Sequence, residues 1–90
     1  MSRQRSLEAI EQSEYVTIGE LVRLTGVRYS TLKFYTEEGM LPFEQAEENL
    51  TRRYRRMESI ERIGYIRQLR EEKMTIPQIK ELLKEGGETL

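Results

Sequence analysis

The chain has 90 residues and lacks cysteine, histidine, aspartate and tryptophan altogether. Without cysteine, disulfides, thiolate metal ligands and thiol-based redox sensing are excluded. Without histidine, the commonest general base and the imidazole metal ligand are missing. All 16 acidic residues are therefore glutamates. We expect no enzymatic activity, no metal site and no cofactor.

Long hydrophobic runs are also missing. No stretch approaches the roughly 18 apolar residues of a membrane-spanning helix, and residues 1–15 have no apolar core of the kind that a signal peptide needs. We therefore expect a soluble, cytoplasmic protein. The length leaves room for one small domain.

The charge of the chain is segregated, although the net charge is only −1. Residues 23–35 carry three basic residues and no acid, and residues 37–48 carry five glutamates and no base. Residues 52–56 then read Arg-Arg-Tyr-Arg-Arg. The two basic blocks indicate surfaces that can meet phosphates. The charge pattern by itself favours solvated charged faces, because the total is acidic.

The first clear local signal is a capping box at Thr17 and Glu20, which predicts a helix over residues 18–25 ending at Gly26. A second helix follows within a few residues and ends at Gly39. Two short helices joined by a tight glycine-containing turn are typical of a helix-turn-helix. A generic helical hairpin shows the same pattern.

The rest of the chain predicts a hairpin followed by two more helices. Residues 40–54 favour a β-hairpin, or wing. Apolar residues spaced by three predict a helix from Met57 to about Glu72, and a second capping box at Thr75 predicts one from Ile76 to about Lys84, ended by Gly86 and Gly87. We expect residues 1–14 to form a flexible arm or a fraying helix, residues 15–85 to form the domain and residues 86–90 to form a tail.

The order of these elements, and several motifs within them, resemble the DNA-binding domain of the MerR family of bacterial transcription regulators. The resemblance covers about residues 15–84, and its wing looks closest to the nitrogen-regulator branch. The motifs that carry it are Tyr-Val-Thr-Ile-Gly-Glu-Leu-Val-Arg-Leu-Thr-Gly-Val at 15–27, Thr-Leu-Lys-Phe-Tyr at 31–35, Gly-Met-Leu-Pro at 39–42, Arg-Arg-Tyr at 52–54, Ile-Arg-Gln-Leu-Arg at 66–70 and Met-Thr-Ile-Pro-Gln-Ile-Lys-Glu-Leu-Leu at 74–83.

The resemblance implies a mainly α winged helix-turn-helix with four helices and a short β-hairpin wing. It implies a nucleoid-associated regulator that binds double-stranded DNA in a sequence-specific way. In this family the second helix enters the major groove, the wing contacts the flanking backbone, and the bound DNA is often bent and untwisted. The family's pairing helix and effector domain do not follow in this chain, so we expect a monomer that pairs only on DNA, with no small-molecule effector site.

The candidate DNA-binding residues lie on the two helices of the motif and on the wing. The N-terminal part of a recognition helix reaches base edges, and its amides favour phosphate. Tyr35 is as readily a core residue as a contact, since amphipathic aromatic residues do both. The candidates are Thr17, Arg23, Arg28, Tyr29, Ser30, Thr31, Lys33, Phe34, Tyr35, Arg52, Arg53, Tyr54 and Arg55.

Departures from the family pattern qualify the resemblance. Arg28 stands where the family has a serine cap, a loss that costs on the order of 1 kcal/mol, and Ser30 stands where the family often has a base-reading arginine. The wing is acidic at Glu44, Glu47 and Glu48. Two alternative functions therefore stay open: a small architectural DNA-binding protein of excision or recombination, and a protein-interaction module that uses the acidic wing.

Overall fold

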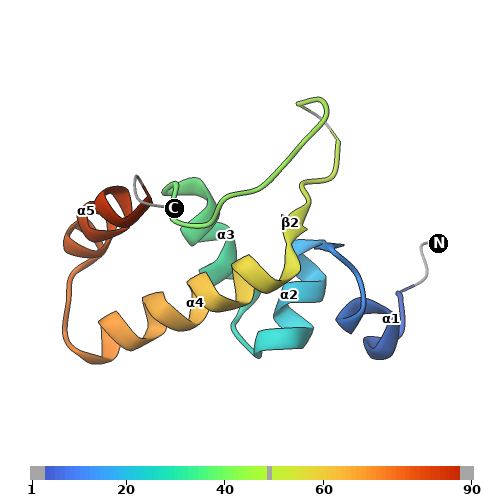
Figure 1. The fold of residues 1–90 in the computed structure, drawn as a ribbon, viewed down its shortest axis with the longest axis horizontal. Helices are drawn as coiled ribbons and strands as arrows, with labels where there is room; N and C mark the ends of the chain where they lie inside the picture. The colour runs from blue at the N-terminus through green and yellow to red at the C-terminus, as the bar shows by residue number, and fades with distance from the viewer. Residues whose placement is uncertain (1–3, 49, 88–90) are drawn as a thin grey trace.

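The computed structural model describes residues 4–48 and 50–87, and its elements are mostly helical (Figure 1). A small antiparallel sheet joins two short strands. This arrangement confirms the mainly α class with a small β element. In chain order, the elements are α1 (Leu7–Glu11), β1 (Tyr15–Val16), α2 (Ile18–Thr25), α3 (Tyr29–Glu37), β2 (Tyr54–Arg55), α4 (Arg56–Glu71) and α5 (Ile76–Gly87).

The helix-turn-helix is formed by α2 and α3, and local signals set most of its ends. Thr17 caps α2, and both hydrogen bonds of the capping box with Glu20 are present. Gly26 and Gly39 follow α2 and α3 in the left-handed conformation, with φ of 75° and 76°. Arg28 precedes α3 without any side-chain cap, as expected from the missing serine.

The wing, defined here as residues 42–53, differs in detail from the expected hairpin. One antiparallel bridge joins Glu44 to Arg53, with backbone N–O distances of 2.7 and 2.8 Å. The paired strands lie elsewhere, because β2 pairs with β1 through Val16–Tyr54 and Tyr15–Arg55. The wing is thus a loop closed by one bridge, and the sheet ties its base to the segment before α2.

The two ends of the chain also depart from expectation. Among the described residues there are five helices rather than four, because α1 forms in the segment expected to be a flexible arm or a fraying helix. Ser6 caps α1, and Ile10 is fully buried. Helix α5 continues to Gly87, beyond the end expected near Lys84. Of the expected tail, residues 88–90 lie outside the described residues.

The core is organised along α4, which crosses the molecule diagonally in Figure 1. Helix α2 packs against α1, α3 and α4, and α5 packs against α4. Ile63, Ile66 and Leu69 of α4 are buried, together with Ile79 of α5. Apolar residues three apart turn gradually around a helix, which lets one helix contact two partners along its length. No helix in the described ranges has the length and apolar character needed to cross a membrane.

Tyr54 is fully buried, and its hydroxyl lies 2.9 Å from the hydroxyl of Thr36. The Thr36 hydroxyl also donates a hydrogen bond of 2.8 Å to the carbonyl of Leu32. A threonine hydroxyl has a single proton. Since the Thr36 hydroxyl donates that proton to the Leu32 carbonyl, Tyr54 must be the donor in the pair and Thr36 the acceptor.

This direction predicts unequal costs for two substitutions. Tyr54→Phe removes the donor and leaves Thr36 bonded to Leu32, so it should destabilise the fold by about 0.5–1.5 kcal/mol. Thr36→Val leaves the buried Tyr54 hydroxyl without its acceptor, and should cost about 1–3 kcal/mol. Urea unfolding of both variants measures the difference. Equal losses, or a larger loss for Tyr54→Phe, would contradict the assigned direction.

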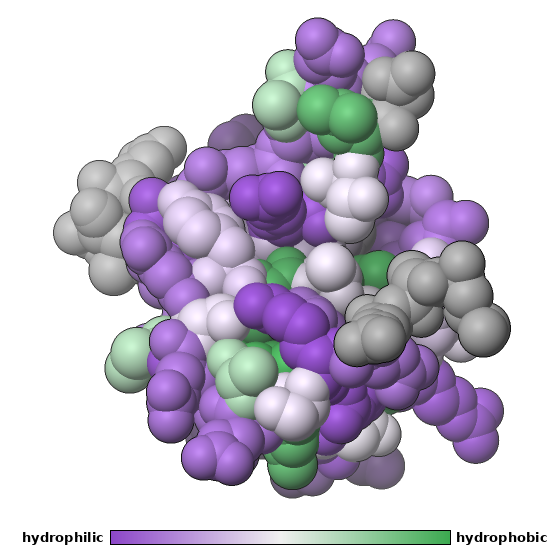
Figure 2. All heavy atoms as spheres, turned by 90° about the vertical axis from the view of Figure 1, so that its right-hand side faces the viewer, coloured by the Kyte–Doolittle hydropathy of each residue, from purple (hydrophilic) through white to green (hydrophobic). Residues whose placement is uncertain are grey.

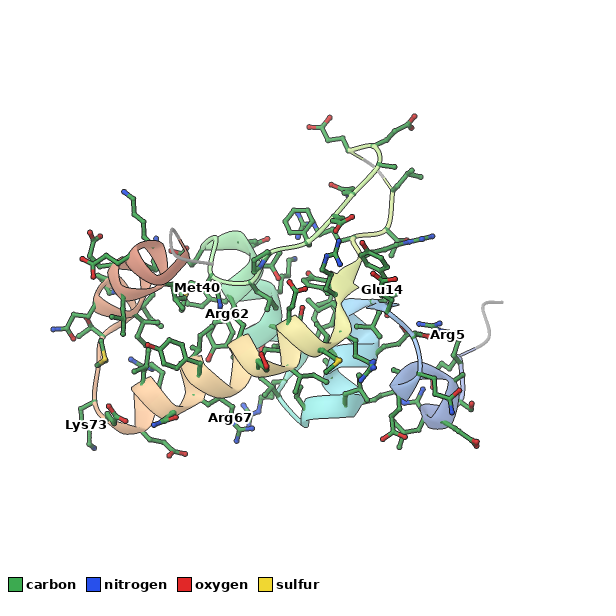
Figure 3. The ribbon with its side chains drawn as sticks, in the orientation of Figure 1. Arg5, Glu14, Met40, Arg62, Arg67 and Lys73 are labelled. Carbon is green, nitrogen blue, oxygen red and sulfur yellow. The ribbon has the colours of Figure 1, made fainter. Side chains whose placement is uncertain are left out.

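Helix α4 ends in a turn that usually contains glycine. Lys73 is the one described non-glycine residue with positive φ, 71°, and it lies in the turn before α5 (Figure 3). The Lys73 N–H donates a hydrogen bond of 3.0 Å to the Arg70 carbonyl, and the Met74 N–H donates one of 3.1 Å to the Leu69 carbonyl. These two bonds form a Schellman motif, in which a side chain at the left-handed position is strained.

We predict that Lys73→Gly stabilises the protein by about 0.5–1 kcal/mol, because it relieves this strain. Gly39→Ala provides the opposite test: its φ is 76° and no atom lies within 4 Å of the added carbon, so only the backbone strain changes. It should destabilise by about 1 kcal/mol. Thermal unfolding measures both shifts, and a Tm lowered by Lys73→Gly would rule out strain at this turn.

Candidate nucleic-acid interface

One side of α3 packs into the core and the other faces solvent. Leu32, Tyr35 and Thr36 are buried. On the opposite side, Ser30, Lys33 and Phe34 are exposed, and Phe34 has 42% of its surface accessible. This division follows the 3.6-residue period of the helix. The exposed side therefore combines a cation, a hydroxyl and an aromatic ring that the core does not use.

The N-terminal turn of α3 is open to solvent. Arg28 and Tyr29 are exposed, the latter at 54%, and Thr31 is half-buried. The N–H groups of Thr31 and Leu32 bond to the Arg28 carbonyl at 3.1 Å. The amides of Tyr29 and Ser30 precede the first intrahelical bonds and point out of the helix end, where a negative group is favoured.

The wing and β2 hold four of the sequence-predicted residues in different environments. The Arg52 guanidinium lies 4.7 Å from the centre of the Phe43 ring, and the Arg53 side chain is exposed. The Arg55 guanidinium lies 5.2 Å from the centre of the Tyr15 ring. Tyr54 points the other way, into the core, so basic side chains on either side of it face outward.

Acidic neighbours already engage Arg55. It pairs with Glu14 and with Glu44, each at 3.3 Å, and Glu44 also accepts a hydrogen bond of 3.1 Å from the Tyr15 hydroxyl. Partial desolvation, and then this hydrogen bond, raise the pKa of Tyr15 above its usual value. The cluster links the segment before α2, the wing and β2.

Arg5, which the sequence pattern does not single out, anchors the N-terminal segment to the start of α2. Its guanidinium donates to both carboxylate oxygens of Glu20, at 2.8 and 2.7 Å, to the Ser13 hydroxyl at 2.7 Å and to the Tyr15 carbonyl at 3.2 Å. The carbonyl of Arg5 accepts a hydrogen bond of 2.6 Å from Arg23. No local periodicity could have indicated this anchor, because its partners are 8 to 18 residues away.

The structure separates the sequence-predicted residues into accessible and inaccessible groups. Tyr35 is 6% exposed and Tyr54 is fully buried, so neither side chain is accessible to DNA in this conformation. The reason is packing: both side chains belong to the buried hydrophobic core. The Thr17 hydroxyl is half-buried and engaged as a cap. Arg23 is exposed but held by the Arg5 carbonyl.

The tip of the wing is acidic and projects away from the helices (Figure 1). Figure 2 shows mostly hydrophilic surface at the α1 end of the molecule, with a hydrophobic area on the projecting loop. Leu50, in this loop, is 49% exposed, and Glu47 and Glu48 are exposed beside it. An acidic tip repels phosphate. The end of the wing next to β2, rather than its tip, is therefore the part suited to contact DNA.

Comparison with known proteins gives two matches. The family model described as MerR HTH family regulatory protein matches residues 16–86. A curated protein from Chromobacterium violaceum, an HTH-type transcriptional activator SoxR homolog, is 44% identical over 52 residues, which cover 58% of this chain and 34% of that protein. The chain thus spans about a third of the length of this relative. No solved structure matches the chain.

The pair formed by Arg5 and Glu20 predicts a pH dependence of stability. The hydrogen bonds from Arg5, helped by the Thr17 amide, hold the pKa of Glu20 below its ordinary value of 4.5. A carboxyl group whose pKa is lower in the folded than in the unfolded state stabilises the fold at pH values above the unfolded-state pKa. This stabilisation is lost as the pH falls through the folded-state pKa. We expect Glu20→Gln to lower Tm at pH 7, and to lower it much less at pH 3.

Melting curves at both pH values measure this effect. Glu11→Gln serves as the matched control, because Glu11 is exposed and none of the hydrogen bonds or ion pairs of the described residues involves its side chain. The control should leave Tm nearly unchanged at both pH values. If Glu20→Gln lowered Tm by the same amount at pH 3 and pH 7, the stabilisation by Glu20 would not depend on its negative charge.

Proposed function

The chain belongs to the family of MerR helix-turn-helix regulatory proteins, and from this premise we propose that α3 reads duplex DNA from the major groove, with its N-terminal turn at the base edges. The observation that carries the proposal is the open N-terminal turn of α3, with Arg28, Tyr29 and Ser30 exposed and Lys33 one turn further on. A B-form major groove admits one α-helix, and the first residues of a recognition helix reach the bases.

These side chains differ in what they can recognise. Arg28 and Lys33 donate hydrogen bonds to the guanine edge or to phosphate. The exposed rings of Tyr29 and Phe34 offer apolar contact to thymine methyl groups, and Tyr29 adds a hydroxyl. Ser30 and Thr31 can donate or accept. The mixture of two aromatic and several polar contacts supports sequence-specific binding over charge-driven binding alone.

Phosphate contacts fall to basic side chains on both sides of α3. Arg52 and Arg53 lie on the wing, and Arg23 lies at the end of α2. Arg23 and Arg55 would reach phosphate by giving up their present acceptors. Thr17 would place the N-terminal end of α2 next to a phosphate. Phosphate contacts position the protein on the duplex and carry no direct sequence information. Tyr35 and Tyr54 are left out of the proposed interface because they are buried.

Transcriptional control at the recognised site is the function that follows from DNA binding in this family. The relative from Chromobacterium violaceum is named as a transcriptional activator. For this chain we propose only the recognition of an operator, because that is the step that its own residues support. Two copies on adjacent half-sites, about one helical turn apart, fit the two-fold symmetry of most operators.

The proposal predicts that Lys33→Ala weakens binding to a selected duplex by about 10-fold or more, since a base contact is worth about 1–3 kcal/mol. Arg53→Ala should weaken binding to all duplexes and reduce the slope of log affinity against log salt by about 0.9. The duplex comes from selection out of a random library, and fluorescence anisotropy at several salt concentrations measures both quantities.

Two variants provide the controls. Arg67→Ala removes an equal charge from the exposed surface of α4 and should change affinity by less than about two-fold. Glu47→Ala, at the wing tip, should not weaken binding. An affinity independent of salt, or a loss caused by Glu47→Ala but not by Lys33→Ala, would favour a protein-interaction module that uses the acidic wing.

A further inference from the structure

A hollow of about 500 Å³ lies between the wing, β2 and α4, and no residue of α3 lines it. Its size is within the range of small-molecule sites, about 300–1,000 Å³. The sequence pattern does not indicate it, and an effector cavity was not expected. The lining residues come from the wing (Pro42, Phe43, Glu44 and Arg53), from β2 (Arg55) and from α4 (Glu58, Ser59, Glu61, Arg62 and Tyr65).

The walls of the hollow include two aromatic rings that the core leaves partly uncovered. Phe43 is 38% exposed and Tyr65 is 42% exposed. Phe43 contacts Tyr54, with ring centres 6.2 Å apart, whereas no described aromatic ring pairs with Tyr65. Exposed aromatic surface beside a hollow provides apolar contact for the body of a small ligand.

The hydroxyl of Ser59 reaches the hollow from its inner side. Ser59 is only 3% exposed and lines the hollow. The hydrogen bonds among the described residues include none from its side chain, yet no enclosed side-chain oxygen or nitrogen in this part of the chain lacks a partner. The Ser59 hydroxyl therefore keeps its access to solvent through the hollow. It can bond to a molecule placed there.

Some of the charged groups that line the hollow form ion pairs with each other, and others do not. Glu44 and Arg55 neutralise each other. Glu58 and Glu61 make no ion pair within the described residues. Arg62 follows Glu58 by four positions and would be its natural partner on a helix, but Arg62 instead donates to the Met40 carbonyl at 3.0 Å (Figure 3).

Glu58 and Glu61 are thus left without an ion-pair partner, although the charge of Arg55 acts on Glu58 from a longer distance, and two guanidinium groups keep free donors. The donors belong to Arg53, whose side chain has no partner among the described residues, and to the remaining N–H groups of Arg62. Carboxylates accept hydrogen bonds from an ammonium group, and guanidinium groups bind carboxylates in a bidentate way. Opposite free charges beside aromatic walls match a ligand that carries both charges and an apolar side chain.

We propose that this hollow binds a free α-amino acid with an apolar, preferably aromatic, side chain. The ammonium group lies against Glu58 and Glu61, the carboxylate against Arg62 and Arg53, and the side chain between Phe43 and Tyr65. Ser59 supplies a further hydrogen bond. The site does not involve the base contacts proposed for α3, but it shares Arg53 and Arg55 with the proposed phosphate contacts. It is therefore tested on the full chain without DNA.

The test compares three compounds of the same shape. L-phenylalanine carries both charges, 2-phenylethylamine lacks the carboxylate and 3-phenylpropionate lacks the ammonium group. Titration of the ¹⁵N-labelled chain, followed by NMR, should give a dissociation constant on the order of 1 mM for phenylalanine. Binding should be at least about five-fold weaker for each of the other two. The shifted amides should be those of the lining segments, 43–44, 53–55 and 58–65.

Charge-neutral variants assign the two ends of the ligand. Glu61→Gln should weaken phenylalanine and 2-phenylethylamine by about five-fold and leave 3-phenylpropionate unchanged. Arg53→Gln should weaken phenylalanine and 3-phenylpropionate and leave the amine unchanged. Glu71→Gln, an exposed position on α4 outside the hollow, is the matched control and should change none of the three.

Several results would overturn the proposal. Equal affinity for all three compounds would mean that apolar contact alone holds them. Tighter binding of the amine than of phenylalanine would assign the hollow to cations, such as the amino terminus of a peptide. Shifts spread over α3 and α5, no saturation at tens of millimolar, or equal losses for all three compounds with Glu61→Gln would exclude the site.

Discussion

The buried hydroxyl of Tyr54 is the constraint on which the position of the wing depends. A tyrosine can be enclosed only where its hydroxyl finds a partner, because an unpaired buried hydroxyl costs about 1–3 kcal/mol. Thr36 of α3 provides that partner, while the backbone of Tyr54 pairs with Val16 of β1. Helix α4 starts two residues later. One residue thereby joins α3, the strand before α2 and the end of the wing.

Internal acceptors engage many of the arginines and leave a small basic surface. Arg5 is bonded to Glu20, Arg23 to the carbonyl of Arg5, Arg55 to Glu14 and Glu44, and Arg62 to the carbonyl of Met40. Phosphate contacts supply most non-specific affinity for DNA. In the proposed mode of binding, a chain with a net charge of −1 and several engaged arginines relies more on the base contacts proposed for α3.

The sequence predicts the elements whose signals are local. The capping box at Thr17 and the glycine at Gly26 define α2 to the residue, because the hydrogen bonds that begin and end a helix come from its own neighbours. Helix α1 and the pairing of β1 with β2 are not predictable in this way. Helix α1 has five residues and is held by contacts of Arg5, and the paired strands have two residues each and are about 40 positions apart.

The site is predicted in part for the same reason. Helical period places Ser30, Lys33 and Phe34 on the exposed side of α3, as the sequence indicates. The run Arg-Arg-Tyr-Arg-Arg looks like one continuous basic surface, but in extended chain successive side chains point to opposite sides. Tyr54 therefore turns inward while its neighbours Arg53 and Arg55 stay exposed. The hollow beside α4 has no sequence signal, because it arises from the distance between the wing and a helix packed elsewhere.

The arginines that are already bonded are not equally free to exchange their acceptors for phosphate. The pairs of Arg55 are exposed, with 46% of its side chain accessible and 72% and 57% of those of Glu14 and Glu44. Such pairs contribute about 0–1 kcal/mol, so a phosphate replaces them at little cost. Glu20 is only 13% accessible and holds Arg5 through both oxygens, so this pair stays in place. Since Glu44 belongs to the wing, the transfer of Arg55 to phosphate would also loosen one of the contacts that fix the wing to β2. In the proposed mode of binding, the contact of Arg55 with the DNA backbone and the position of the wing are therefore linked through the Glu44 carboxylate.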